Sequence, residues 1–98
     1  MNQATTLAEL RKTAASLRAM GVTALYLFGS VAHNKAHAGS DIDLFLDYDP
    51  QSGFSLIELV GIKQQLESLF SQPVDITTRD SLHPLLKADI EQSAVQVF

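Results

Sequence analysis

The sequence predicts an α/β (α+β) fold in which a small mixed β-sheet is flanked by helices. Two observations lead to this prediction. Segments with apolar residues at helical spacing alternate along the chain with short apolar segments that suit strands. Residues 41–46 alternate carboxylates with aliphatic side chains, which is the two-residue period of a strand with one buried face. The expected order of elements is αβ(α)βαβα.

The first helix is expected from about Leu7 to Met20. Thr6 and Glu9 fit a capping box before it, and Gly21 ends the helical spacing after it. A buried strand should follow at residues 24–28, and a short helix could span residues 31–37. Residues 37–40 then have the composition of a turn.

The second half of the chain repeats the alternation. The strand at residues 41–46 should end at residues 47–50. Ser55 and Glu58 form a second capping box, which starts a helix that ends before Pro73. The expected buried stripe of this helix is Leu59, Ile62, Leu66 and Leu69.

A third short strand is expected at residues 74–77, and a last helix from about Pro84 to Ala94. That helix should direct Leu85, Leu86 and Ile90 inward.

Bulk composition limits the function classes. The 98 residues are 46% hydrophobic and 18% charged, which favours one globular domain over residues 1–98. No segment approaches the roughly 18 apolar residues of a membrane span. The first residues lack the basic patch and apolar run of a signal peptide, so a soluble, unprocessed protein is expected. Cys is absent, which excludes disulfides and thiolate chemistry and suits a reducing cytoplasm. A net charge of −4 with 7 scattered basic residues argues against nonspecific nucleic-acid binding.

Acidic residues are concentrated in one region: Asp41, Asp43, Asp47 and Asp49 fall within nine positions. On a strand, Asp41 and Asp43 would project from the same face about 7 Å apart, and Asp75 would follow the same alternation in the third strand. Asp is a poor strand former, and neighbouring carboxylates repel each other. A bound dication would reverse the sign of this interaction, because hard Mg²⁺ prefers carboxylate oxygen and commonly bridges to phosphates.

The turn after the first strand is a second candidate part of a binding site. Gly29 permits a sharp bend and lets backbone N–H groups approach a phosphate, while Ser30 can donate its hydroxyl. The first strand ends at this turn, whereas the second begins with its acids, so both reach one site only if the strands are antiparallel. The third strand should run parallel to the second, because it also begins near its acid. A mixed sheet follows.

The spacing of Gly29-Ser30, ten residues and Asp41-Ile42-Asp43 resembles the signature of nucleotidyltransferases of the DNA polymerase β superfamily. Asp75 falls where that family places its third carboxylate. The size and layout are similar to those of the minimal nucleotidyltransferase (MNT) group of bacteria and archaea. The likeness covers nearly the whole chain, including the segment around Leu82-His83-Pro84.

The resemblance implies a nucleotidyltransferase fold and a role for each motif. Asp41, Asp43 and Asp75 would be the catalytic metal ligands for two Mg²⁺ ions, with Mn²⁺ as a possible substitute. Gly29 and Ser30 would hold the triphosphate of a nucleoside triphosphate, with ATP as the expected donor. Two further candidate nucleotide contacts are Ser40 and His33.

The resemblance also implies a partner. Relatives of this size are often antitoxins of a HEPN-domain toxin, and some of them transfer AMP to a toxin tyrosine. Larger superfamily members carry extra domains that hold the acceptor, so the acceptor is expected on another molecule. Self-association is left open.

One departure from the family pattern supports an alternative function. Members frequently carry Arg then Gly where this chain has His33 and Asn34. His33 could donate to a phosphate, but without a fixed positive charge it would stabilise a leaving group less. The alternative is therefore a catalytically weak nucleotide-binding antitoxin module that neutralises its partner by occlusion. A nucleic-acid polymerase fragment is disfavoured by the acidic charge.

Simpler interpretations were weighed for the same residues. Asp41 and Asp43 could be solvated strand residues, and Gly29-Ser30 could be an ordinary strand-to-helix turn. Asp47 and Asp49 resemble part of a calcium loop, but the required later Gly and Glu are out of register, which favours a solvated strand end. The three histidines lack paired ligand spacing, so zinc is not expected. Ser30 lacks the partners of a hydrolase triad.

Overall fold

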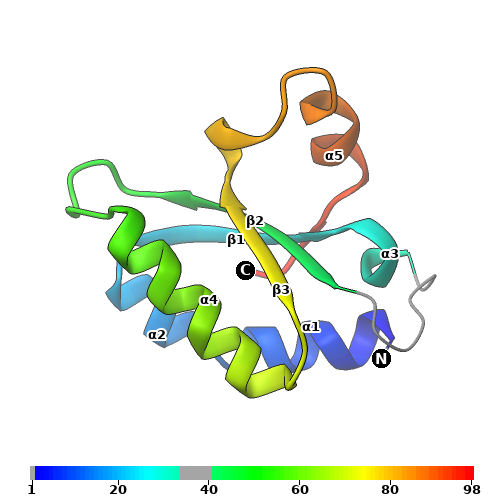
Figure 1. Cartoon of the computed structure of the whole chain (residues 1–98), viewed down its shortest axis with the longest axis horizontal. Coiled ribbons are helices and arrows are strands. Elements are labelled where there is room, and N and C mark those ends of the chain that lie inside the picture. Colours follow the sequence, from blue (N-terminus) through cyan, green and yellow to red (C-terminus); the bar gives the residue numbers. More distant parts are fainter. Residues whose placement is uncertain (1, 34–40) are drawn as a thin grey trace.

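The computed structural model describes residues 2–33 and 41–98, and Figure 1 shows their arrangement. The sheet has four strands in the order β3-β2-β1-β4. The elements in chain order are α1 (Gln3–Arg11), α2 (Ala14–Ala19), β1 (Val22–Phe28), α3 (Gly29–Ala32), β2 (Ile42–Tyr48), α4 (Leu56–Phe70), β3 (Val74–Thr78), the 3₁₀ turn η1 (Arg79–Ser81), α5 (Lys87–Ser93) and β4 (Val95–Gln96). The predicted fold class is confirmed, and β4 is a strand that the sequence did not predict.

The strand directions agree with the prediction. β1 pairs antiparallel with β2, and Phe28 lies opposite Asp43. β2 pairs parallel with β3, and Asp43 lies opposite Asp75. The end of β1 and the beginnings of β2 and β3 therefore meet at one edge of the sheet.

The two faces of the sheet differ in what covers them. Helices α1, α2 and α4 lie against one face, whereas η1 and α5 lie on the other side, as Figure 1 shows. The main core fills the space beneath the first face, because every second strand residue points into it. Its fully buried members are Leu10, Leu17, Leu25, Leu27, Ile42, Leu44, Leu46, Ile62 and Leu66. The opposite face carries the acids of the alternating pattern together with the rings of Tyr26, Phe28 and the fully buried Phe45.

The prediction of one long first helix was wrong. The chain forms α1 and α2 with a break at Lys12 and Thr13, where the Thr13 backbone N–H and hydroxyl both donate to the Leu10 carbonyl, at 3.0 and 2.6 Å. The expected Thr6 capping box is also absent. Asn2 caps α1 by accepting from the Thr5 backbone N–H, and Thr6 is a buried helical residue. Asn at the N-cap satisfies an orphan N–H as well as Thr does, so composition alone did not place the start.

The second capping box is confirmed, because the Ser55 side chain accepts from the first turn of α4 and the Ser55 backbone N–H donates to Glu58. The predicted buried stripe needs one correction: Leu69 is 44% exposed, and Phe70 is buried in its place. Helix α4 ends at Ser71, which adopts the left-handed conformation with φ of 54°.

The last helix is shorter than predicted and has a different orientation. α5 begins at Lys87, and Leu85 and Leu86 precede it with exposures of 84% and 54%. Neither leucine points inward, and no residue of α5 is fully buried. The short helix after β1 is also displaced, since α3 occupies residues 29–32, and residues 34–40 lie outside the described residues.

No helix among the described residues is long and apolar enough to cross a membrane.

Candidate active site

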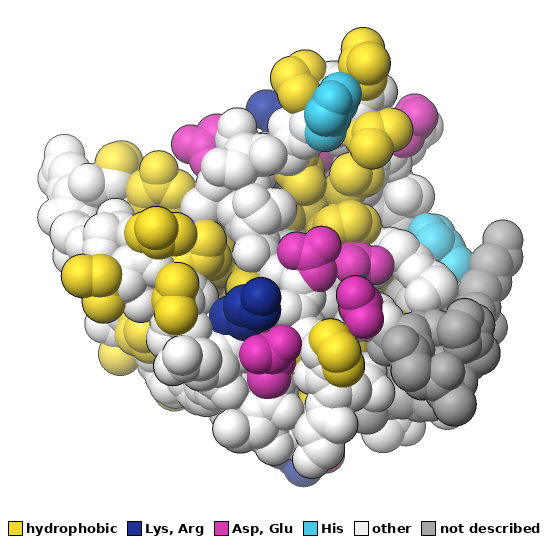
Figure 2. Space-filling model, in the orientation of Figure 1, with side chains coloured by type: hydrophobic (Ala, Val, Ile, Leu, Met, Phe, Trp, Pro, Cys, Tyr) yellow, Lys and Arg dark blue, Asp and Glu magenta, His cyan; other side chains and the backbone are white. Residues whose placement is uncertain are grey.

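The candidate site lies where the predicted acids meet on the face of the sheet opposite the main core. Asp43 and Asp75 are direct register partners on β2 and β3, so their side chains leave the sheet from neighbouring strands about 4.8 Å apart. Asp41 lies just before β2 and is exposed. Figure 2 shows acidic side chains gathered in one cluster on this face. The structure therefore places Asp43 beside Asp75, with Asp41 near enough for its charge to act on Asp43.

Partial burial, together with two neighbouring acids, raises the pKa of one acid of the cluster. The pKa of Asp43 is raised from its ordinary value of 3.8 to about 6, first because of partial burial and then because of the negative charges of Asp75 and Asp41. None of the ion pairs formed by the described residues includes Asp41, Asp43 or Asp75. The cluster thus holds negative charge that the described part of the chain does not neutralise.

The glycine turn is packed directly against this cluster. Gly29 begins α3 with a φ of 77°, a conformation that side-chain-bearing residues rarely adopt. A Cβ on Gly29 would also lie 2.3 Å from Oδ2 of Asp43. Ser30 follows in the same turn and is half-buried, and His33 lies exposed at the end of α3. Glycine is therefore required here both by the backbone angle and by the contact with the acid.

The donor set fits a hard divalent cation. All three side chains offer carboxylate oxygen, which Mg²⁺ prefers, and their mutual repulsion would be relieved by a positive ion. Within residues 2–33 and 41–98, no three acidic or histidine side chains are already arranged around a common point. The set is thus an open one, in which water or phosphate oxygens would supply further ligands.

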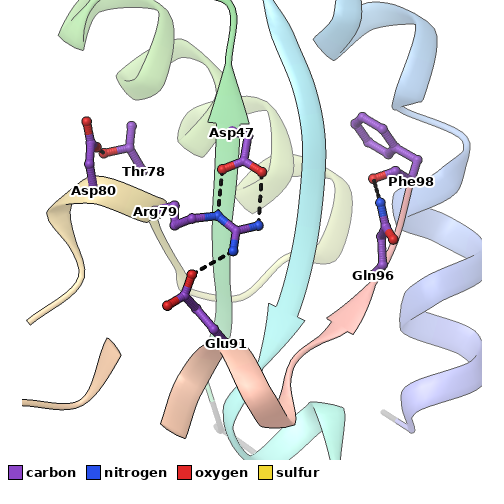
Figure 3. Close-up of polar contacts among 7 residues, drawn as sticks. All are labelled: Asp47, Thr78, Arg79, Asp80, Glu91, Gln96 and Phe98. Carbon is purple, nitrogen blue, oxygen red and sulfur yellow. Dashed lines mark hydrogen bonds and ion pairs between the residues drawn. The ribbon is translucent and has the colours of Figure 1, made fainter. Parts of the chain in front are cut away.

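A second charged cluster lies at the other end of β2, and the sequence did not reveal it. Arg79 donates to Asp47 through Nε at 2.8 Å and Nη2 at 3.0 Å, and to Glu91 through Nη1 at 2.7 Å (Figure 3). Its guanidinium carbon also lies 4.8 Å from the ring centre of Tyr26 and 5.1 Å from that of Phe45. Hydrogen bonds to Asp47 and then to Glu91 raise the pKa of Arg79 further above its usual range.

The interpretation of Asp47 as a solvated strand end was therefore wrong. β2 continues through Tyr48, and Asp47 is half-buried in a two-pronged ion pair. The sequence did not indicate this ion pair, because Arg79 lies 32 residues after Asp47. Asp49 is exposed and accepts from the Gln51 backbone N–H in a turn, as expected of a loop acid.

One predicted nucleotide contact is not covered by the described structure. Ser40 lies outside the described residues. His83 is exposed, and its Nδ1 accepts from the Leu85 backbone N–H. No histidine or acid cluster suited to zinc occurs in the part of the chain that the structure describes.

Comparison with known proteins identifies the class of this fold and site. Residues 7–97 match the nucleotidyltransferase domain family, and the chain belongs to that family. A relative from Methanocaldococcus jannaschii, named as a protein adenylyltransferase, is 40% identical over 88 residues, which are 90% of this chain and 92% of the relative. A second adenylyltransferase by name from the same organism is 34% identical over 77 residues, 78% of this chain and 76% of the relative.

Solved structures agree with this family. A structure described as a minimal nucleotidyltransferase superposes with a TM-score of 0.79 at 32% identity, covering 97% of this chain and 95% of the other. A toxin–antitoxin structure with AMP-PNP gives a TM-score of 0.73 at 23% identity, covering 90% of this chain and 72% of the other. The second likeness shows a shared fold. The resemblance to minimal nucleotidyltransferases is thereby confirmed.

Proposed function

We propose that this protein transfers a nucleotide, AMP from ATP, to a hydroxyl group of a partner protein. The observation that carries the proposal is the pairing of Asp43 with Asp75 beside Gly29, with Asp41 close enough to raise the pKa of Asp43. The family and the relatives named as adenylyltransferases support the same reaction class.

The roles of the residues follow from their chemistry. Asp41, Asp43 and Asp75 would hold two Mg²⁺ ions, which Mn²⁺ could replace. These ions would lower the pKa of the attacking hydroxyl and neutralise the departing pyrophosphate. Gly29 lets the Asp43 carboxylate lie directly against the turn. The Ser30 hydroxyl beside it can donate a hydrogen bond to phosphate oxygens. His33 is an exposed candidate donor to the same phosphates.

The acceptor is proposed to belong to a second protein. Two structures with this fold are titled as toxin–antitoxin assemblies, one of them with AMP-PNP. By analogy, the partner here would be a HEPN-type toxin, and the acceptor would be a tyrosine hydroxyl of that toxin. An exposed acidic site on an open sheet face is accessible to such a side chain.

The test is transfer of label from α-labelled ATP to the purified product of the adjacent reading frame, in the presence of Mg²⁺. Asp43→Asn should reduce transfer by about a thousandfold, because a carboxylate that holds the metal contributes several kcal/mol in the transition state. Asp49→Asn is the matched control, since that acid is exposed in a turn outside the cluster, and it should retain transfer. Equal transfer by Asp43→Asn and wild type would refute the proposal.

A second candidate function is neutralisation of the partner by occlusion with little catalysis. It is favoured by His33, which stands at the end of α3 without the fixed positive charge common in the family. Neutralisation that survives the double change Asp41→Asn with Asp43→Asn would select occlusion over transfer.

A further inference from the structure

Helix α4 exposes an apolar surface that the main core does not use. Leu56, Ile57 and Val60 are 72%, 81% and 44% exposed. Together with Gly61 and Gln64 they line a groove of about 460 Å³, and we call these five residues the α4 patch. None of the five carries a charge. Water contact with three large aliphatic side chains on one helix face is unfavourable, and such patches commonly mark binding surfaces.

Gly61 is the second feature of this patch that the fold of the chain alone does not explain. It lies inside a 15-residue helix, where glycine costs about 1 kcal/mol relative to alanine. A Cβ at Gly61 would meet only the Met20 methyl, at 3.8 Å, which is an ordinary contact. The monomer would therefore accept alanine. Glycine leaves a gap between neighbouring side chains of the patch, where another backbone can approach closely.

The position of the patch indicates what fills it. Figure 2 shows hydrophobic side chains over the N-terminal half of α4, on the same face of the molecule as the acidic cluster. A partner that presents its hydroxyl to the acids must contact this face, and a stable interface of roughly 20 to 30 residues a side extends well beyond the acids themselves. An interface of that size centred on the acids would also cover the α4 patch.

We propose that the α4 patch is the docking surface for the partner protein that carries the acceptor hydroxyl. The partner inserts the aliphatic side chains of an amphipathic helix into the groove at Gly61. This inference rests on the proposed function, because it assumes an acceptor on a second protein. It adds where that protein binds and which chemical character of surface it presents.

The test measures binding of the purified product of the adjacent reading frame by titration calorimetry, in chelator and without nucleotide. Val60→Glu should weaken binding at least tenfold, because it places a charge in the apolar groove. Leu69→Glu is the matched control: Leu69 lies on the same helix with the same 44% exposure but outside the groove, so its affinity should stay within about twofold. Equal affinities for the two variants, or no binding by wild type, would overturn the proposal.

Gly61→Ala supplies a readout that a purely structural role would not give. It should raise the melting temperature of the isolated chain, because alanine is the better helix former, and yet weaken partner binding. A lower melting temperature would show instead that Gly61 serves the fold. A second copy of this chain is the other possible occupant of the α4 patch, and light scattering of the wild type alone tests for it. A dimer that Val60→Glu dissociates would assign the patch to that second copy and overturn the proposal.

Failure of this inference can be told apart from failure of the proposed function. If both hold, Asp43→Asn binds the partner normally without transfer, whereas Val60→Glu binds Mg²⁺ and ATP normally but transfers poorly at low partner concentration. If Asp43→Asn transfers like wild type while Val60→Glu does not bind, the docking surface stands and the catalytic assignment fails.

Discussion

Asp43 and Asp47 lie on the same face of β2, four residues and therefore about 13 Å apart, but their electrostatic surroundings are opposite. Asp47 accepts hydrogen bonds from Nε and Nη2 of Arg79, and Nη1 of Arg79 donates to Glu91. Asp43 instead faces Asp75 and Asp41, and its pKa is raised to about 6. The charge of Asp47 at one end of β2 is neutralised by Arg79. The acids around Asp43 at the other end have no such basic partner among the described residues.

This difference separates a structural acid from a candidate functional acid without reference to any relative. A carboxylate that stabilises a fold is satisfied by groups of the same chain, because an uncompensated charge near an apolar core is costly. A carboxylate kept negative beside like charges is stabilised by water or by a cation that binds, and such perturbed groups gather at functional sites. The comparison yields three predictions, in order of expected effect.

The largest effect concerns the neutralised end. Arg79→Leu should lower the free energy of unfolding by about 2 kcal/mol, because it leaves Asp47 and Glu91 without their charged donor. This figure is reduced for solvent screening, since the paired side chains are about one-third exposed. Urea denaturation measures it. Arg79→Lys should recover only part of the loss, because lysine lacks the planar fork. An Arg79→Leu variant as stable as wild type would show that the ion pair of Asp47 with Arg79 does not stabilise the fold.

The next effect concerns the negative end. Mg²⁺ at ten times its dissociation constant should add about 1.4 kcal/mol to the stability of the wild type by mass action. Thermal unfolding across a Mg²⁺ titration measures this gain. Asp43→Asn should lose most of it, whereas Asp47→Asn should keep it, although its starting stability is lower. If both variants lost the stabilisation by Mg²⁺ equally, the two ends of β2 would not differ in their affinity for the cation.

The smallest effect is a pH dependence of the metal-free protein. The pKa of Asp43 is about 6 in the folded chain against an ordinary 3.8, so the folded state binds its proton more tightly than the unfolded state. The stabilising contribution is therefore complete below about pH 4 and is lost as the pH rises through 6. Its size is about 1 kcal/mol after reduction for the exposed part of the side chain.

Denaturation in chelator between pH 4 and 7 measures this slope. Asp43→Asn should flatten it and should be more stable than wild type at pH 7, since a neutral amide removes the cost of the partly buried charge and its repulsion by Asp75 and Asp41. An unchanged slope in the variant would assign the pH dependence to another group.

Much of the candidate site was accessible from sequence because it depends on local periods and on strand direction. The alternation Asp41-Ile42-Asp43 placed Ile42 in the core and Asp43 opposite it, and the glycine turn required antiparallel strands. Asp41 was only partly anticipated, since it lies before β2 instead of within it. The break at Thr13 was missed because the Thr13 hydroxyl bonds to the backbone and overrides the helical spacing there. The start at Lys87 was missed because residues before it form a turn closed by hydrogen bonds to the His83 carbonyl.

The sequence by itself determined the fold class, the strand that carries Asp43 and the resemblance to nucleotidyltransferases, because residue periodicity and motif spacing are properties of neighbouring residues. Only the tertiary structure decided which acid is compensated. Arg79 reaches Asp47 and not Asp43 because β3 runs parallel to β2 and delivers residue 79 at the far end of the sheet. The ion-pair partner of an acid depends on which distant segments of the chain pack together, and no local sequence pattern specifies that packing.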